Sequence, residues 1–396
     1  MSPPGPGLRE ELSNPEMARR VYFMVSPSSG PTPTPSAFDL SRETWRAWVV
    51  RQGAKPFAGD QIREWLYARE RRDPGEFSNL SRSLRTALEA EFRWDLPEVD
   101  TLLCSGDGSE KILFRTHDGL FAECVLMPSE KRVTLCVSSQ VGCRFGCTFC
   151  QTGKMGLSRH LSAGEILGQV LLANGRLEDR GGPHRKVTNV VFMGMGEPLD
   201  NFDTVVETCR TLTDPRLFGL SKHRVTVSTV GLVPEIRRLG ESVAVSLAIS
   251  LHSADDADRS RMMPINRKYP LSELKKALLD YPVRTRHGIT FEYVMIRGEN
   301  DSLEDARKLV RFVHGLKAKV NLIPMNAHPG NPMQASEADR LREFQRYLSE
   351  RSIPAPVRYS RGQDVSAACG QLATKRMDEL SLSPREVFRS RRGPGA

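Results

Sequence analysis

Two periodicities of hydrophobic residues divide the chain into an N-terminal and a C-terminal part. Between residues 41 and 92, apolar side chains recur at intervals of three and four, which predicts three short helices. The positions that define these helices are Trp45, Trp48 and Val49, then Ile62, Trp65 and Leu66, then Leu84, Leu88 and Phe92. Ser81 is the expected N-cap of the third helix. We interpret this part as a small helical domain whose apolar stripes form its core.

Beyond residue 130 the pattern changes to strands that alternate with amphipathic helices, which is typical of a parallel sheet. Before it, alternation in residues 102–127 around Asp118-Gly119 predicts a β-hairpin that joins the two parts. Helices are expected from Ser162, where Ser-x-x-Glu is a capping box, from Ser302 to Gly315, and from about Ser336. The predicted strands are Val133–Ser138, Val187–Met193, Arg224–Thr229, Val243–Leu251, Ile289–Ile296 and Val320–Pro324.

Candidate functional residues stand at the carboxyl ends of these strands. Segment 139–150 follows the first strand, 194–198 follows the second, Ser228 ends the third, Ser250 and His252 end the fourth, and Asn326 follows the sixth. The carboxyl ends of parallel strands meet at one face of a barrel, where active sites lie. The order of the chain therefore predicts one shared site.

The strongest chemical signal is a C-x3-C-x2-C run formed by Cys143, Cys147 and Cys150. Three thiolates are one fewer than the four ligands that close a structural zinc or iron–sulfur site. A metal centre bound in this way keeps one position open for a substrate or cofactor. The alternatives are a chance grouping, or three of four zinc ligands with the fourth elsewhere.

The cysteine run resembles that of the radical S-adenosylmethionine (SAM) enzymes, and three further segments narrow the resemblance. They are Cys136-Val137-Ser138-Ser139-Gln140, Gly194-Met195-Gly196-Glu197-Pro198 and Ala367-Ala368-Cys369-Gly370-Gln371-Leu372. All three are similar to segments of the dual-specificity RNA methyltransferases, which methylate C2 of adenosine. The likeness extends from about Leu40 to about Ala373. It implies an α/β fold, a partial (β/α)6 radical SAM barrel with a small N-terminal helical accessory domain that helps to grip RNA.

The expected domain organisation follows from the resemblance and from the composition of the ends. We expect a disordered tail at 1–38, the accessory domain at 39–100, a hairpin linker at 101–130, the barrel with a C-terminal catalytic-cysteine loop at 131–373, and a basic tail at 374–396. The first segment is rich in Pro, Ser and Gly and lacks the apolar core of a signal peptide. A start codon assigned upstream of Met17 or Met24 is the other interpretation.

The resemblance also implies cofactors and their ligands. Cys143, Cys147 and Cys150 would hold one [4Fe-4S] cluster whose fourth iron binds SAM, and two SAM molecules would be used per turnover. The expected SAM-binding residues are Gly196, Glu197, Ser228, Ser250, Leu251, His252 and Asn326. The alternatives are an ordinary turn for Gly-x-Gly and polar groups satisfied within the core for the others.

Two further cysteines are assigned to the methyl transfer. Adenine C2 is electron-poor and does not attack a sulfonium methyl group, whereas a thiolate does. The resemblance implies that Cys369 takes a methyl group from one SAM, that a second SAM supplies the radical, and that RNA becomes joined to Cys369. Cys136 would then remove the C2 proton and form a disulfide with Cys369, and Glu123 would orient the adenine. A buried structural thiol and a surface glutamate are the alternatives. Cys104, Cys124 and Cys209 are expected to be packing residues.

Composition and charge agree with an RNA partner without proving one. The chain has 396 residues, 39% of them apolar, and a net charge of +9. Residues 259–286 hold eight Lys and Arg, which form either an RNA-binding surface or a solvated basic face. Because no run approaches the roughly 20 apolar residues of a membrane span and the thiols need a reducing compartment, we expect a cytoplasmic protein. The expected partners are 23S rRNA and tRNA, together with an external electron donor such as a flavodoxin system, and the expected state is a monomer.

Two competing functions remain at this stage. One is methylation of C8 of the same rRNA adenosine by the related antibiotic-resistance class, which resembles Gly-Met-Gly-Glu-Ala where this chain has Pro198. The other is a non-catalytic iron–sulfur protein that binds RNA or senses redox state. Such a protein would not need Cys136, Cys369 and the Gly-Met-Gly-Glu loop together.

Overall fold

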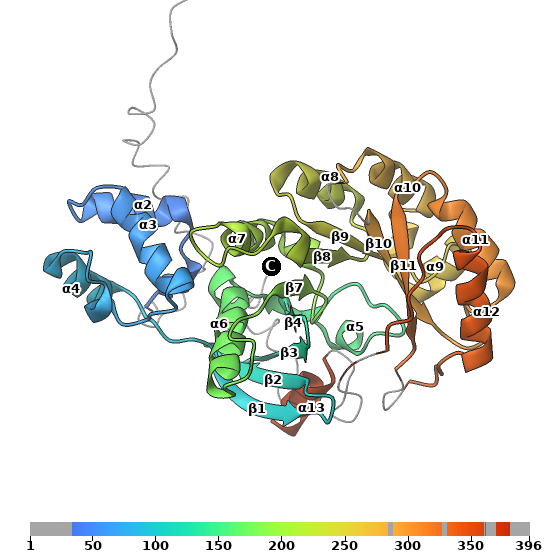
Figure 1. The fold of residues 1–396 in the computed structure, drawn as a ribbon, viewed down its shortest axis with the longest axis horizontal. Helices are drawn as coiled ribbons and strands as arrows, with labels where there is room; N and C mark the ends of the chain where they lie inside the picture. The colour runs from blue at the N-terminus through green and yellow to red at the C-terminus, as the bar shows by residue number, and fades with distance from the viewer. Residues whose placement is uncertain (1–33, 284–287, 327–330, 360, 362–369, 381–396) are drawn as a thin grey trace, which may run out of the picture. The chain divides into compact units, whose positions relative to one another are not determined.

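The described part of the chain is built around one sheet, with a group of helices before it (Figure 1). The computed structural model describes residues 34–283, 288–326, 331–359, 361 and 370–380. The chain divides after Pro35, and all the named elements belong to the unit that begins at Ser36.

The N-terminal helices form where the three- and four-residue intervals predicted them. They are α2 (Arg42–Arg51), α3 (Phe57–Arg63) with a following π-helical turn (Glu64–Ala68), and α4 (Arg82–Glu91). Ser81 caps α4 as expected, because its Oγ accepts the Leu84 backbone N–H at 3.2 Å. Trp45 and Trp48 lie in the core, packed edge-to-face at 5.7 Å between ring centroids. The stripes are therefore core positions, as interpreted.

Six parallel strands confirm the predicted strand–helix alternation. They are β4 (Arg132–Cys136), β7 (Asn189–Phe192), β8 (Val225–Thr229), β9 (Ser246–Ser250), β10 (Ile289–Met295) and β11 (Ala318–Pro324). Each pairs in parallel with the next, so the strand order follows the chain. The sheet order runs from β1 at one edge to β11 at the other, which is the open, partial barrel that was expected.

The segment before the barrel is part of the same sheet. Instead of a joining hairpin, the chain forms three antiparallel strands, β1 (Glu98–Cys104), β2 (Glu110–Arg115) and β3 (Phe121–Ser129). The third strand pairs with β4, where Val125 stands opposite Cys136. The predicted hairpin is therefore correct in type, but it continues the sheet to nine strands.

The remaining elements lie between the strands or follow the last one. The helices are α5 (Gln151–Met155), α6 (Ala163–Asp179), α7 (Phe202–Thr213), α8 (Val233–Ser242), α9 (Asp256–Met262), α10 (Leu271–Asp280), α11 (Leu303–Val313), α12 (Ala338–Ser349) and α13 (Gln371–Glu379). A two-stranded sheet pairs β5 (Gln140–Cys143) with β6 (Gly156–His160). The expected capping box at Ser162 is present, and Ser302 forms a second one with Asp305. Helix α13 begins within the predicted barrel segment and occupies part of the predicted basic tail.

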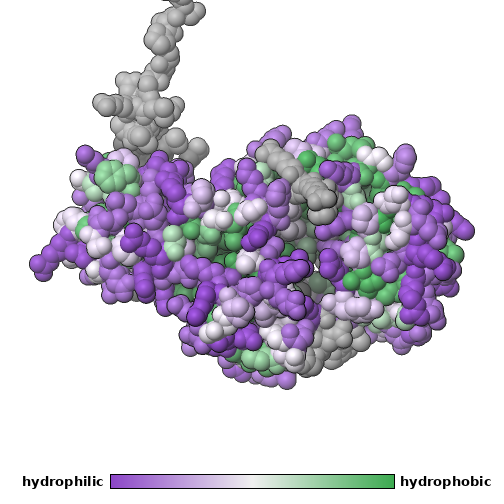
Figure 2. Space-filling model, viewed as in Figure 1, coloured by the Kyte–Doolittle hydropathy of each residue, from purple (hydrophilic) through white to green (hydrophobic). Residues whose placement is uncertain are grey.

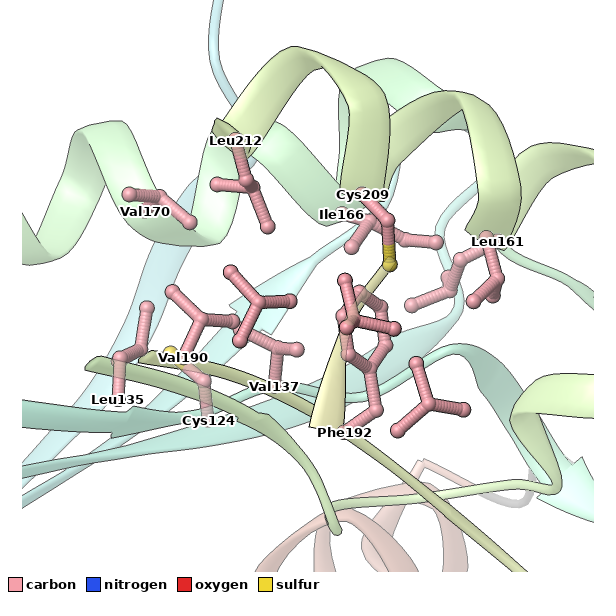
Figure 3. Packing of buried hydrophobic residues seen from close by; sticks show 14 of the residues in the cluster. Cys124, Leu135, Val137, Leu161, Ile166, Val170, Val190, Phe192, Cys209 and Leu212 are labelled. Atoms are coloured by element: carbon pink, nitrogen blue, oxygen red, sulfur yellow. The ribbon is translucent and has the colours of Figure 1, made fainter. Parts of the chain in front are cut away.

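Apolar side chains from the sheet pack against α6 and α7 (Figure 3). Cys124 and Cys209 belong to this core, with 1% and 0% of their surfaces exposed. Both are packing residues, as expected. Cys104 is exposed at the end of β1, so the same expectation is wrong for it.

Hydrophilic side chains predominate on the face shown in Figure 2. No helix in the described ranges has the length and apolar character that crossing a membrane requires.

Candidate active site

A pocket of about 330 Å³ gathers most of the residues that the sequence singled out. Its lining includes Cys143, Cys147, Cys150, Gly196, Glu197, Ser228, Ser250, His252 and Asn326. These residues stand at or beyond the carboxyl ends of five of the six parallel strands, so the structure brings them together in one pocket, as expected from the order of the chain. Leu251 is buried outside the lining, and its backbone N–H donates to the Glu292 carbonyl oxygen at 3.0 Å.

The cysteine run forms a tight loop between β5 and α5. Gly142 has φ +79°, and a Cβ at this position would lie 1.8 Å from the Gly156 carbonyl oxygen, so only glycine fits there. Cys143 and Cys147 are buried, and Cys150 is half-buried. Burial raises the pKa of the Cys143 thiol to about 12 and that of Cys147 well above its usual value. Both thiols therefore need a nearby positive charge, such as a metal, to ionise at neutral pH.

The three cysteines are a donor set that fits an iron–sulfur cluster. Within the described residues, no three His, Cys, Asp or Glu side chains are grouped as the ligands of one metal ion would be. A multi-iron cluster spaces its thiolates more widely than one zinc ion does, and sulfur is its ordinary protein ligand. Three thiols on one glycine-rich loop beside a pocket fit a [4Fe-4S] group.

The loop at Gly194–Pro198 is attached to the segment at Cys136–Gln140. Ser138 Oγ accepts the Met195 N–H at 2.8 Å, and Gln140 Oε1 accepts the Glu197 N–H at 2.8 Å. Gly196 has φ +99°, and a Cβ there would lie 2.5 Å from the Gln140 Cβ. Through these contacts, the side chains of segment 136–140 hold the backbone of the 194–198 loop in its conformation.

Glu197 presents a buried carboxyl group to the pocket. Its Oε1 accepts the Leu199 N–H at 3.0 Å and its Oε2 accepts the Val230 N–H at 2.8 Å. Burial raises its pKa to about 7, although the two backbone donors act in the opposite direction. A cationic ligand group would favour the ionised form, so this carboxyl suits an ammonium.

His252 presents a neutral imidazole. Its Nδ1 accepts the Val294 backbone N–H at 3.0 Å, so the ring proton lies on Nε2. Burial, and secondly Arg259, lowers its pKa to about 3. The Phe149 ring packs edge-on against it at 4.7 Å between centroids. His252 is therefore a hydrogen-bond donor at every physiological pH.

Two charged residues of the site were missed in the sequence. Glu292 lines the pocket from β10 and accepts a hydrogen bond from Asn321 Nδ2 at 2.9 Å. A lone carboxylate inside an apolar predicted strand was the signal that could have found it. Arg259 was assigned to the basic run, but only 1% of its surface is exposed. It therefore does not belong to a solvated or RNA-facing basic surface.

Glu123 and Cys136 lie on one face of the β3–β4 pair, outside the pocket lining. Val125 stands opposite Cys136, and Glu123 is two residues before Val125, so all three side chains share a face. Cys124 points to the other face, into the core of Figure 3. Glu123 is 2% exposed, which rules out the surface-glutamate alternative.

The Glu123 carboxylate is engaged by the protein. It pairs with Lys111 Nζ at 3.2 Å and accepts backbone N–H groups from Gly370 at 2.5 Å and Ala373 at 3.3 Å. Gly370 has φ +81°, and a Cβ there would lie 2.4 Å from Thr152 Oγ1. The start of α13 is thus held between β3 and α5. Cys369, which precedes Gly370 in the sequence, lies outside the described residues.

Two family models match the chain. The model described as the radical SAM superfamily matches residues 137–313, and the model described as the ribosomal RNA large subunit methyltransferase N-terminal domain matches residues 37–93.

Proteins of known family align over almost the whole chain. The dual-specificity RNA methyltransferase RlmN of Rhodopseudomonas palustris (strain BisB5) is 44% identical and aligns over 91% of this chain and 94% of its own length. The protein of the same name from Anaeromyxobacter sp. (strain Fw109-5) is 48% identical over 87% of this chain and 92% of its own. A crystal structure of a radical SAM methyltransferase from Sphaerobacter thermophilus superposes with a TM-score of 0.79 at 41% identity, covering 85% of this chain and 98% of that one.

Proposed function

We propose a function from one fixed premise: the chain belongs to the RlmN family of dual-specificity RNA methyltransferases. Members of this radical SAM family use a [4Fe-4S] cluster and two SAM molecules per turnover. The chain then methylates C2 of an adenosine in the peptidyl-transferase centre of 23S rRNA, and of the adenosine 3′ to the anticodon in tRNA. The observation that carries the proposal is the single pocket shared by the three cysteines and the Gly196-Glu197 loop.

The pocket residues divide into cluster ligands and SAM-binding groups. Cys143, Cys147 and Cys150 hold the cluster, which when bound reduces SAM and so supplies the radical chemistry. The Glu197 carboxylate receives the ammonium of SAM, because its pKa of about 7 leaves it ready to ionise beside a cation. His252 donates from Nε2. Ser228, Ser250 and Asn326 supply further polar contacts, and Leu251 supports the site from behind.

The second group of residues carries the methyl transfer. Cys369 takes a methyl group from one SAM as S-methylcysteine. The radical derived from the second SAM removes one hydrogen atom from that methyl group, and the resulting carbon radical bonds to adenine C2. The adduct gives up one electron to the cluster and its C2 proton to Cys136. The Cys136 thiolate then displaces the carbon from the Cys369 sulfur, the carbon takes a proton to become the methyl group of the product, and an external reductant restores the disulfide to thiols. The position of Glu123 supports a role in this group, since it shares a face with Cys136 and binds the residue after Cys369.

Pro198 favours C2 over C8 as the methylated atom, and the family premise agrees. The remaining proposals are a flavodoxin-type electron donor, a monomer and a cytoplasmic location. Mass spectrometry of nucleosides from rRNA and tRNA treated with the protein tests the product directly. Appearance of 8-methyladenosine in place of 2-methyladenosine would overturn the assignment.

The methyl-carrier role has its own test. After incubation with methyl-labelled SAM, tryptic mapping should place the label on the peptide that contains Cys369, and Cys369→Ala should abolish both this label and RNA methylation. Label on another cysteine, or methylated RNA without labelled protein, would contradict the role.

Cys136→Ala separates this mechanism from simpler ones, and Cys124→Ala is its matched control. The two thiols are neighbours in the sheet but lie on opposite faces. Cys136→Ala should accumulate RNA joined to Cys369, seen as a nuclease-sensitive shifted band on a denaturing gel. Cys124→Ala should lose about 1 kcal/mol of stability and show no such band. A Cys136→Ala enzyme with normal turnover would refute the role.

A further inference from the structure

Arg259, on α9, is a buried cation directly behind the pocket. Only 1% of its surface is exposed. Its Nε donates to the Leu251 carbonyl oxygen at 3.1 Å, and its Nη2 donates to the carbonyl oxygens of Val230 at 2.8 Å and Ser250 at 3.1 Å. These carbonyls belong to the ends of β8 and β9, where Val230 and Ser250 line the pocket. The guanidinium is thus fixed against two of the pocket's walls.

The described residues offer this cation no carboxylate within salt-bridge distance. Its Nη1 donates to Asn266 Oδ1 at 2.8 Å, and Asn266 in turn donates to Asp256 Oδ1 at 2.8 Å. The Asn266 amide thus separates the Asp256 carboxylate from the guanidinium. Asp256 Oδ1 also accepts the Leu271 N–H at 2.9 Å. A buried charge without a counter-ion is costly, so its presence calls for a negative group nearby.

The cysteine loop is the neighbour that can supply that negative charge. The Thr148 N–H donates to the Met262 carbonyl oxygen at 3.0 Å, and Cys147 packs with Met262 and Met263 at the end of α9. The Met263 N–H in turn donates to the Arg259 carbonyl oxygen at 2.7 Å. Arg259 therefore belongs to the helix whose end packs against Cys147, and its positive charge faces the side of the pocket that holds the cysteine loop.

We propose that Arg259 is the buried counter-ion of the cysteine-bound cluster and raises its reduction potential. Thiolate-ligated iron–sulfur groups carry net negative charge, and reduction adds another. A fixed positive charge in a medium of low dielectric stabilises the reduced form more than the oxidised form. Arg259 would not bind the cluster itself. Its charge would change the reduction potential through the cysteine loop that it neighbours. The inference rests on the proposed role of Cys143, Cys147 and Cys150 as cluster ligands.

A purely structural role is the competing explanation, because the same guanidinium holds three carbonyl groups. Two substitutions separate charge from hydrogen bonding. Arg259→Lys keeps the charge and loses most of the hydrogen bonds, whereas Arg259→Gln keeps two N–H donors and loses the charge. Arg261→Gln is the matched control, since it removes the same charge from the same helix at a side chain that is 57% exposed.

The experiment is a redox titration of the anaerobically reconstituted proteins, followed by the electron paramagnetic resonance of the reduced cluster, with thermal unfolding and iron content measured in parallel. We expect a lower potential for Arg259→Gln, and near-native potentials for Arg259→Lys and Arg261→Gln, although Arg259→Lys unfolds at a lower temperature. An unshifted potential in Arg259→Gln overturns the inference. Equal shifts in the Gln and Lys variants, or equal loss of the cluster from both, also overturn it, because lysine keeps the charge. A wild-type protein that binds no cluster refutes the proposed function instead.

Discussion

The Glu123 carboxylate accepts the backbone N–H of Gly370 at 2.5 Å, between two residues that lie 247 positions apart in the sequence. Lys111 Nζ approaches the same oxygen at 3.2 Å. The end of the chain that carries Cys369 is therefore attached to β3, on the face that also presents Cys136. Both side chains are 2% exposed, so water cannot stabilise the Glu123 carboxylate, and Lys111 supplies the positive charge that it needs.

Lys111→Met should destabilise the protein strongly. It leaves the Glu123 carboxylate buried without its cation, and breaking a buried pair in this way costs about 3–5 kcal/mol. Denaturant unfolding measures the loss. In the double variant Lys111→Met with Glu123→Gln, much of the stability should return, because a neutral amide oxygen still accepts the Gly370 N–H and no ion remains.

An exposed ion pair provides the control for this prediction. Arg340 and Glu343 on α12 form a pair at 3.1 Å with 47% and 37% of their side chains exposed. Arg340→Met should change stability by less than about 1 kcal/mol. A Lys111→Met protein as stable as Arg340→Met would show that the buried pair contributes little to holding α13.

Gly196→Ala should abolish SAM binding. Its φ of +99° is strained for any side chain, and the added Cβ would lie 2.5 Å from the Gln140 side chain that supports Glu197. Gly298→Ala is the control, because Gly298 has φ +69° and open space around its Cβ position. That variant should lose about 1–2 kcal/mol of stability and bind SAM normally. Equilibrium binding of SAM to both proteins decides the question, and retention of binding by Gly196→Ala would contradict the account of the loop.

The sequence predicted the periodic elements and the residues with unusual chemistry, but not the charges inside the fold. Strands, caps and the cysteine loop depend on local patterns, so the six parallel strands and the α6 capping box could be anticipated, whereas the short β5–β6 pair was not. Arg259 could not, because it sits in a run of basic residues and its burial depends on carbonyl groups from β8 and β9. The link from Glu123 to Lys111 and Gly370 likewise depends on the packing of α13 against the sheet, which no local pattern encodes.

Glu292 predicts a pH dependence of stability with a definite sign. Only 7% of its surface is exposed, and burial raises its pKa from 4.5 to about 7 despite the hydrogen bond from Asn321. Below the unfolded pKa both states hold the proton. As the pH rises from about 4.5 to 7, the unfolded chain releases it while the folded chain keeps it, so the free energy of unfolding falls by up to about 3 kcal/mol.

Glu292→Gln should remove this loss, because the amide stays neutral and still accepts the Asn321 hydrogen bond. We expect the variant to exceed the native protein in stability by up to about 3 kcal/mol at pH 8, and to lie within about 1 kcal/mol of it at pH 5. Denaturant unfolding of the two proteins at both pH values gives the comparison. Equal destabilisation of Glu292→Gln at pH 5 and pH 8 would contradict this prediction. It would show that the folded protein holds Glu292 as a carboxylate at both pH values and is stabilised by its charge.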